Sequence, residues 1–280
     1  MILLKLPRAP ITLVSAITLA LISCTNYLLP VGAQSARPVN KTPSSGRVRF
    51  TPPPKPKQKS PDFSGHGRPG RRAGGGSRSP CPAKDPPLTA LMPVTNWGKT
   101  VASNPTFWFY VPYSPQELHS GEFVLQESEG NDIYRTPFTL PKTPGFVSFS
   151  IPHTQAPLKI NKLYRWYFKL YCEPQKSSAP VFVEGWVQRF ALTPKLESQL
   201  QAAKLREYTV YADNGIWYDA VASLAELSRT NPANPRLDQD WADLLSLRGV
   251  GLEKIQQEPI IGQVIPFPLV GSSSSQPIAH

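Results

Sequence analysis

The stretch LYRWYFKLYC, residues 163–172, decides the fold. Tyr164, Trp166, Phe168 and Leu170 stand at every second position, with Arg, Tyr or Lys between them. This period is typical of a β-strand with one buried face. We therefore predict a strand whose aromatic stripe lies in the protein core. A functional aromatic platform at the same positions is the alternative.

Further short β segments flank this strand, and Gly and Pro punctuate the turns between them. They cover residues 106–112, 121–128, 132–140, 145–152 and 181–192. No helical pattern intervenes in this part of the chain. Such a series predicts an antiparallel β-sandwich, immunoglobulin-like in appearance, over residues 66–192.

The sequence changes to a helical period after residue 192. Thr193 suits the cap position and Pro194 the first turn of a helix that should run as far as the glycine at 215. A second helical segment follows that glycine. The protein is therefore predicted to be α+β, with a helical unit over residues 193–258 and a flexible tail over residues 259–280.

The helical unit has features of one repeat family. Gly215, Ala220 and Pro232 stand where a tetratricopeptide unit has its turn glycine, its small residue and its closing proline. A further helix is expected over residues 237–247. We predict a tetratricopeptide-like helical hairpin plus this one further helix, docked on the sandwich.

The N-terminus has the layout of a secretory signal peptide, residues 1–33. Lys5 and Arg8 precede an apolar run over residues 11–23, and a small-residue pattern ends at Ala33. Because the run is too short for a comfortable membrane span, we expect an exported protein, periplasmic or extracellular, without a transmembrane helix after processing. The tetrapeptide LISC ending at Cys24 also fits a bacterial lipoprotein site, so lipidation at Cys24 and membrane anchoring stay open as the alternative.

Basic charge is concentrated behind the signal peptide. Residues 34–80 hold eleven Lys and Arg against one acid, Asp62, while the whole chain has a formal net charge of +11. Residues 34–65 are also rich in Pro and poor in large apolar side chains, which predicts a disordered basic linker.

The run GRPGRRAGGGSRSPC, residues 67–81, follows the linker. Its arginines Arg68, Arg71, Arg72 and Arg78 are candidates for contact with an envelope polyanion, such as acidic polysaccharide, lipopolysaccharide or anionic lipid. A solvated spacer without a specific partner is the alternative. Arg/Gly runs also bind RNA, but export argues against nucleic acid as a partner.

Removal of a signal peptide after residue 33 leaves two cysteines, Cys81 and Cys172. An even pair in an oxidising compartment predicts a disulfide between them, with two free buried thiols as the alternative. Neither a CxxC motif nor a Cys/His spacing indicates a metal site, and no cofactor site is predicted.

Several of these segments together resemble one known family. The Gly/Arg run into Cys81, FWFYVP, LYRWYFKLYC, VEGWVQR and GIWYDAV are similar to a cyanobacterial family of unknown function, domain of unknown function 928. The resemblance covers roughly residues 66–260. It implies that the Gly/Arg run starts the folded domain, where Arg71 and Arg72 would pair with acids of the sandwich. It implies no activity and no catalytic residue.

Familiar catalytic motifs do not occur in the chain, including HExxH, GxSxG and SxxK with its companion motifs. We therefore expect a non-enzymatic binding or adaptor protein of the cell envelope, whose partner is a polyanion or another envelope protein. Two alternatives stay open: a lipid-anchored envelope scaffold, and a hydrolase of envelope glycans that uses paired carboxylates.

Overall fold

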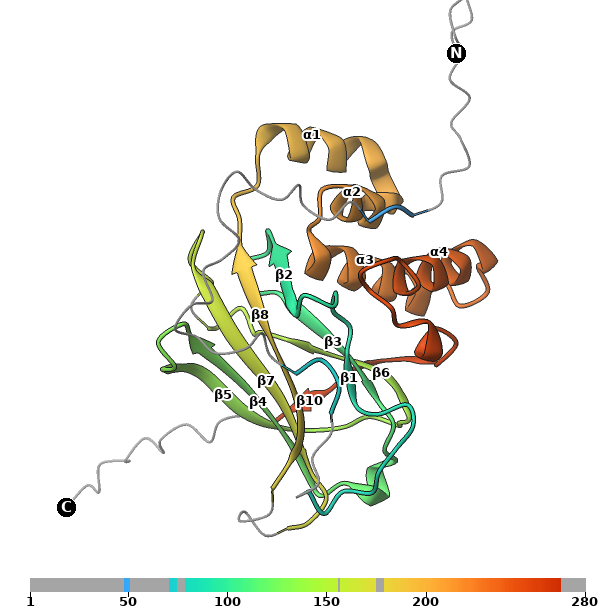
Figure 1. Ribbon diagram of the computed structural model, residues 1–280. Coiled ribbons are helices and arrows are strands. Elements are labelled where there is room, and N and C mark those ends of the chain that lie inside the picture. The colour runs from blue at the N-terminus through green and yellow to red at the C-terminus, as the bar shows by residue number, and fades with distance from the viewer. Residues whose placement is uncertain (1–47, 51–70, 75–78, 156, 175–178, 268–280) are drawn as a thin grey trace, which may run out of the picture. The chain divides into compact units, whose positions relative to one another are not determined.

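The computed structural model describes residues 48–50, 71–74, 79–155, 157–174 and 179–267 (Figure 1). The predicted signal peptide with Cys24, most of the predicted linker, Arg68 and Arg78 lie outside the described residues. Among the helices that the structure describes, none is long and apolar enough to cross a membrane.

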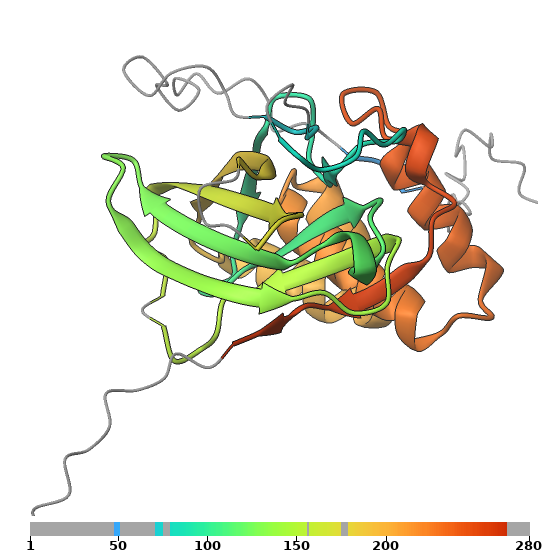
Figure 2. The same cartoon turned by 90° about the horizontal axis from the view of Figure 1, so that it is seen from below.

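Two β-sheets form the centre of the fold (Figures 1 and 2). Sheet A has the strand order β1 (Thr89–Ala90), β3 (Thr106–Val111), β6 (Gly145–Ser150), β9 (Ile260–Gln263). Sheet B has the order β10 (Ile265–Pro266), β5 (Asp132–Thr139), β4 (Ser120–Glu127), β7 (Leu163–Tyr171), β8 (Val181–Arg189), β2 (Trp97–Thr100). The α+β class is confirmed, and the six predicted β segments correspond to β3 through β8.

The prediction of a purely antiparallel sandwich is wrong at two strand pairs. The central pairs β3–β6, β4–β5, β4–β7 and β7–β8 are antiparallel, but β2 runs parallel to β8 and β9 runs parallel to β6. The paired strands lie far apart in the chain in both parallel cases, so no hairpin turn fixes their relative direction. Both sheets are therefore mixed.

Helices follow β8 in the chain: α1 (Pro194–Ala203), α2 (Glu207–Asp213), α3 (Trp217–Thr230) and α4 (Pro235–Leu245). Thr193 caps α1 as predicted, because its side chain accepts a hydrogen bond from the Leu196 amide. The first helix expected from the sequence is divided, since Lys204 adopts a left-handed φ of 53° at the start of η2 (Lys204–Arg206). Gly215, with φ 69°, makes the turn between α2 and α3.

Aromatic side chains fill the space between the two sheets. Phe109 of β3 stacks on Phe168 of β7 with 4.0 Å between ring centroids, and Phe123 of β4 stacks on Phe149 of β6 at the same distance. Trp166 is fully buried beside them. The stripe predicted from residues 163–172 is therefore core, and an exposed platform at these positions is ruled out.

Helices α2, α3 and α4 share a second core with the other face of sheet A. Phe146 of β6 meets Trp241 of α4 with 5.2 Å between ring centroids, and Trp217 of α3 donates its indole N–H to the Leu91 carbonyl at 2.8 Å. Phe50, which the sequence placed in the linker, lies edge-on to the Trp217 ring at 5.1 Å. The fold thus has three layers in the order helices, sheet A, sheet B (Figure 1).

Residues 71–74 of the Gly/Arg run close one edge of the sandwich. The Arg72 carbonyl accepts a hydrogen bond from the Ala90 amide at 2.8 Å, on the side of sheet A. The Arg71 carbonyl accepts one from the Glu184 amide of β8, also at 2.8 Å, on the side of sheet B. One short segment therefore satisfies backbone groups of both sheets, and these residues belong to the folded domain as expected.

Glycine is required for the close approach of this segment. A Cβ atom at Gly74 would lie 3.0 Å from side-chain atoms of both Leu88 and Val181. Contacts of that length are tighter than ordinary packing, so a larger residue would require Leu88, Val181 or the segment itself to shift.

Strands β9 and β10 close the opposite edge. β9 pairs with β6 in sheet A, and the chain then crosses so that β10 pairs with β5 in sheet B. Val264, between the two strands, is buried in the core between the sheets. The prediction of a flexible tail from residue 259 is therefore wrong for residues 260–266, which satisfy backbone groups at the edges of β5 and β6.

The predicted disulfide between Cys81 and Cys172 is present, with 5.2 Å between the Cα atoms and a sequence separation of 91. It links the end of β7 to the segment that leads into β1. In the chain-entropy account, closing a loop of this length stabilises the fold by about 4–5 kcal/mol.

Candidate functional site

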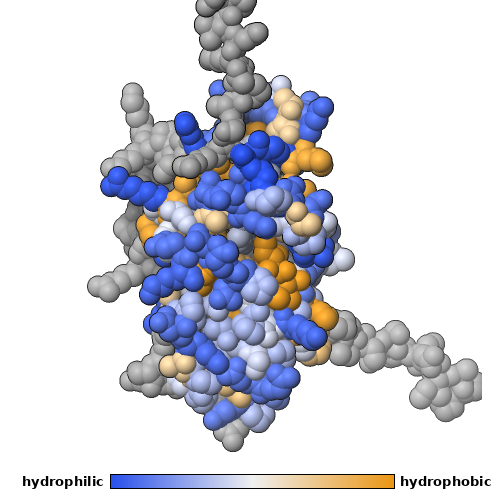
Figure 3. All heavy atoms as spheres, turned by 90° about the vertical axis from the view of Figure 1, so that its right-hand side faces the viewer, coloured by the Kyte–Doolittle hydropathy of each residue, from blue (hydrophilic) through white to orange (hydrophobic). Residues whose placement is uncertain are grey.

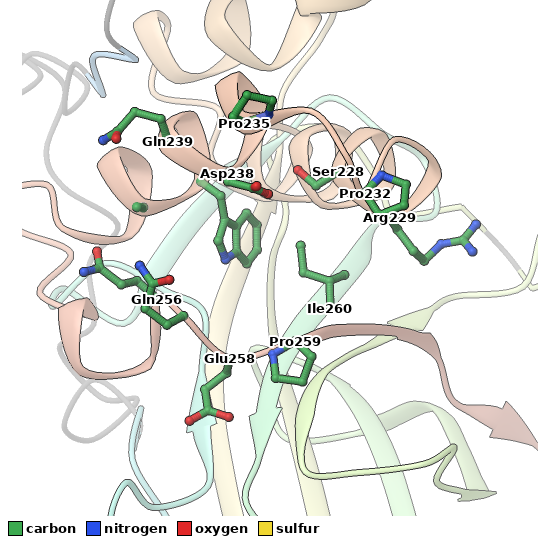
Figure 4. Close-up of a pocket in the computed structure, with 13 residues that line it drawn as sticks. Ser228, Arg229, Pro232, Pro235, Asp238, Gln239, Gln256, Glu258, Pro259 and Ile260 are labelled. Carbon is green, nitrogen blue, oxygen red and sulfur yellow. The ribbon is translucent and has the colours of Figure 1, made fainter.

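A groove of about 560 Å³ lies between the helices and the segment that leads into β9 (Figure 4). We call it the α3–α4 groove. Its lining side chains come from the end of α3, from α4 and the turn before it, and from residues 256–260 after η3 (Glu253–Ile255). The side of the molecule shown in Figure 3 is largely hydrophilic, with a compact apolar group near its centre.

Local sequence holds both walls of the groove in place. Asn234 caps α4 by accepting a hydrogen bond from the Arg236 amide, and Pro235 occupies the first helical position. The opposite wall is anchored to sheet A, since the Phe146 amide donates to the Pro259 carbonyl at 2.7 Å. Because each wall is fixed by its own backbone contacts, the groove is preformed.

Two buried polar atoms lack partners in this groove. Trp241 is 3% exposed and Ser228 is 7% exposed, and both line the groove. Neither the Trp241 Nε1 nor the Ser228 Oγ has a hydrogen-bond partner among the described residues. Buried polar groups are normally paired, so these two atoms are exceptions. Because each atom is itself buried, a molecule bound in the groove would pair with it only after neighbouring side chains moved aside.

Charged side chains stand at the rim. Arg229 pairs with Glu226, with 2.6 Å between Nη2 and Oε1. Asp238 and Glu258 lie on opposite walls, and Figure 4 shows the Glu258 carboxylate directed away from Asp238. Glu258 interacts instead with Tyr110: burial raises the pKa of the Tyr110 hydroxyl, and the nearby Glu258 carboxylate raises it further. The two carboxylates therefore do not face each other across the groove.

The two described arginines of the Gly/Arg run, Arg71 and Arg72, have different surroundings. Arg72 donates through Nη1 to the Met92 carbonyl at 3.0 Å and to the Val250 carbonyl. Burial lowers its pKa, and the negative charge of Glu253 opposes that shift. Arg71 is exposed and lies above the ring of Phe182. Arg72 thus ties the run to the body of the protein through carbonyl groups, not through the acids that the resemblance implied.

The groove could not be predicted from the sequence. Ser228 and Trp241 belong to different helices, and their shared surface exists only after residues 256–260 fold against sheet A. The sequence carries no motif that joins these three segments. Within the part of the chain that the structure describes, no group of three His, Cys, Asp or Glu side chains could hold a metal ion.

Comparison with known protein families gives a match over most of the chain. The family described as Domain of Unknown Function (DUF928) matches residues 73–260, which is most of the chain. The chain belongs to this family. The family's first matched residue, Ala73, lies in the segment that closes the sandwich edge, and its last, Ile260, begins β9. No match was found among curated proteins.

Proposed function

We propose that this DUF928 protein is a non-enzymatic binding or adaptor protein of the cell envelope, and that its α3–α4 groove holds an extended peptide segment of another envelope protein. One observation carries the proposal: Trp241 and Ser228 line the same groove, and each has a buried polar atom without a partner among the described residues. Leaving such atoms without partners costs about 1–3 kcal/mol each, which a bound peptide backbone would recover.

The lining of the groove favours a peptide. Pro232, Pro235, Pro259 and Ile260 offer rigid apolar contacts, while the polar atoms described above lie among them. An extended backbone presents alternating carbonyl and amide groups, so it can accept from the Trp241 N–H while its side chains cover the apolar residues. The volume is in the range of ordinary small-ligand sites.

On this proposal the α2–α3 hairpin is a tetratricopeptide-like unit. Ala220 is fully buried, as the small residue at a close helix contact should be, and Gly215 makes the turn. Such helical units commonly present binding surfaces formed between neighbouring helices.

Export is also part of the proposal. Its support is the signal-peptide pattern together with the Cys81–Cys172 disulfide, since disulfides persist in oxidising compartments. Processing at residue 33 gives a periplasmic or extracellular protein, and processing before Cys24 gives the lipid-anchored alternative. The mass of the mature N-terminus distinguishes the two.

The binding test uses a random-peptide phage library panned on the intact protein. Trp241→Phe removes the indole N–H and keeps an aromatic ring against Phe146, and Ser228→Ala removes the hydroxyl. We expect selected peptides to bind the wild type and to lose about fivefold in affinity with either variant, since a net hydrogen bond contributes about 1 kcal/mol.

Gln199→Ala is the matched control, because Gln199 is exposed and lines a separate shallow depression between α1 and α2. It should leave peptide binding unchanged. Peptides that bind all of these proteins equally would contradict the groove assignment. Hydrolysis of envelope glycans that is lost on Asp238→Asn would replace the proposal with the hydrolase alternative.

A further inference from the structure

The outer face of sheet B, turned away from sheet A, forms a second surface. Strand register places its outward side chains in rows across β4, β7 and β8. Glu122, Lys169 and Phe182 form one row, and Val124, Tyr167 and Glu184 the next. The described helices pack against the other side of the sandwich, so none of them covers this face (Figures 1 and 2).

Aromatic rings on this face lie beneath positive charges. The Arg165 guanidinium lies 4.9 Å from the Tyr167 ring centre, and the Lys169 ammonium lies 5.6 Å from the same ring. Lys99 of β2 lies 5.9 Å from the Trp97 ring centre. Contacts of this kind hold flexible cationic side chains in fixed positions, which lowers the entropy lost when they bind an anion.

Cations exceed acids on the face. The cations are Arg71, Lys99, Arg135, Arg165 and Lys169, and the acids are Glu122, Asp132 and Glu184. Glu122 is shared by Arg135, at 2.7 Å, and by Lys169, at 3.1 Å. Lys99 has ring contacts but no ion pair among the described residues. The surface therefore keeps positive charge that its own acids do not neutralise.

We propose that the outer face of sheet B binds a chain of acidic polysaccharide. Carboxylate groups of the sugar chain would pair with Lys99, Lys169 and Arg135, and the apolar face of one of its rings would lie over Tyr171, which is half-buried. The rows of rings and cations suit a long, repetitive, flexible ligand that carries one charge type at regular intervals. This inference is independent of the α3–α4 groove. The two surfaces lie on opposite sides of sheet A, so an adaptor could hold a polysaccharide on one and a protein on the other.

The test measures binding of the intact protein to immobilised polygalacturonate, with neutral dextran as the uncharged comparison. Lys99→Gln combined with Lys169→Gln removes two cations and leaves Glu122 paired with Arg135. Lys142→Gln combined with Lys195→Gln removes two exposed cations outside this face and serves as the matched control. We expect the first pair to weaken binding about tenfold and the control about twofold or less, because one surface charge pair contributes up to about fivefold.

An NMR signal from a residue on this face distinguishes binding here from binding to the basic N-terminal residues, which every variant retains. The Trp97 indole N–H, identified by its loss in Trp97→Phe, should shift on addition of polygalacturonate and stay in place with dextran. Equal weakening by both double variants, binding without a shift of this resonance, or equal binding to dextran would overturn the proposal. So would a shift caused by anionic vesicles but not by the polysaccharide, which would assign the face to a membrane surface.

Discussion

Asp219 shows how one residue couples α3 to the end of β2. It stands in the first turn of α3, where its carboxylate accepts a hydrogen bond from the Val101 amide at 3.3 Å and a further one from the Thr100 side chain. Burial raises its pKa to about 6, and these hydrogen bonds only partly oppose that shift. The carboxyl group of Asp219 therefore titrates at a pH at which ordinary aspartates are already ionised.

The raised pKa of Asp219 predicts a pH dependence of stability with a definite sign. Between the ordinary aspartate pKa of 3.8 and the folded-state value of about 6, the folded protein binds more protons than the unfolded chain. The contribution of Asp219 is thus complete below about pH 4 and is lost as the pH rises through 6, by up to about 3 kcal/mol. Urea unfolding from about pH 4 to pH 7 should show this loss in the wild type and less of it in Asp219→Asn. The same slope in both proteins would contradict the assignment.

The two neighbouring arginines give a second prediction. Arg72→Ala removes a half-buried guanidinium from the Met92 and Val250 carbonyls and should lower the free energy of unfolding by about 2–4 kcal/mol. Arg71→Ala removes an exposed side chain from above the Phe182 ring and should cost less than about 1 kcal/mol. Thermal and urea unfolding of both variants measure the difference. Equal losses would mean that the segment is not anchored through Arg72.

Among the elements, α3 is the one that joins the helical layer to both cores. Its Tyr218 reaches the space between the sheets, where the hydroxyl accepts from the Trp166 indole N–H at 2.7 Å and donates to the Trp186 carbonyl at 3.0 Å. Gly98 makes room for it, since a Cβ there would lie 2.8 Å from the Tyr218 ring. The helix is therefore held in register by hydrogen bonds as well as by apolar packing.

Two tryptophans on neighbouring helices provide a matched comparison at this scale. Trp217→Phe loses the hydrogen bond to the Leu91 carbonyl, whereas Trp241→Phe loses none that the structure describes. Both substitutions remove a similar volume from the same core. We expect Trp217→Phe to lower the free energy of unfolding by about 1–2 kcal/mol more than Trp241→Phe. A larger loss for Trp241→Phe would show that its indole N–H has a structural partner.

The sequence predicted the elements better than their connections. The alternation of aromatic and polar side chains in residues 163–172 and the cap residue Thr193 are local signals. The strand β7 and the helix α1 form where these signals predict them. The break at Lys204 was missed, because a left-handed lysine has no composition signal. The groove was missed for a different reason. Ser228 and Trp241 stand out because their side-chain polar atoms have no hydrogen-bond partner among the described residues, and this can be seen only in the folded chain.

At the scale of the whole molecule, the sandwich is sealed by segments from both ends of the described chain. Residues 71–74 satisfy one edge, and β9 with β10 satisfies the other. The sequence predicts a flexible tail for the second of these segments, because short strands with Gly and Pro resemble loops. Their pairing with β5 and β6 depends on long-range contacts that no local pattern encodes.

Truncation tests this architecture. Deletion of residues 259–280 removes β9, β10 and the buried Val264, so we expect a loss of about 3 kcal/mol or more and association through the exposed edges of β5 and β6. Deletion of residues 268–280 leaves these strands intact and should change neither property. Thermal unfolding and size-exclusion chromatography measure both effects. A stable monomer after the longer deletion would show that the edges need no covering.

The position of β9 and β10 also sets the time at which the domain can finish folding. A ribosome makes the chain from its N-terminus. Residues 71–74 therefore cannot complete their hydrogen bonds until β8 is made, and β5 and β6 cannot pair at their outer edges until residues 260–266 are made. A nascent chain stalled before residue 260 therefore keeps an open sheet and should remain sensitive to protease. The last edge can close only after residues 260–266 have been synthesised, and until then the unpaired edges of β5 and β6 stay open to other chains.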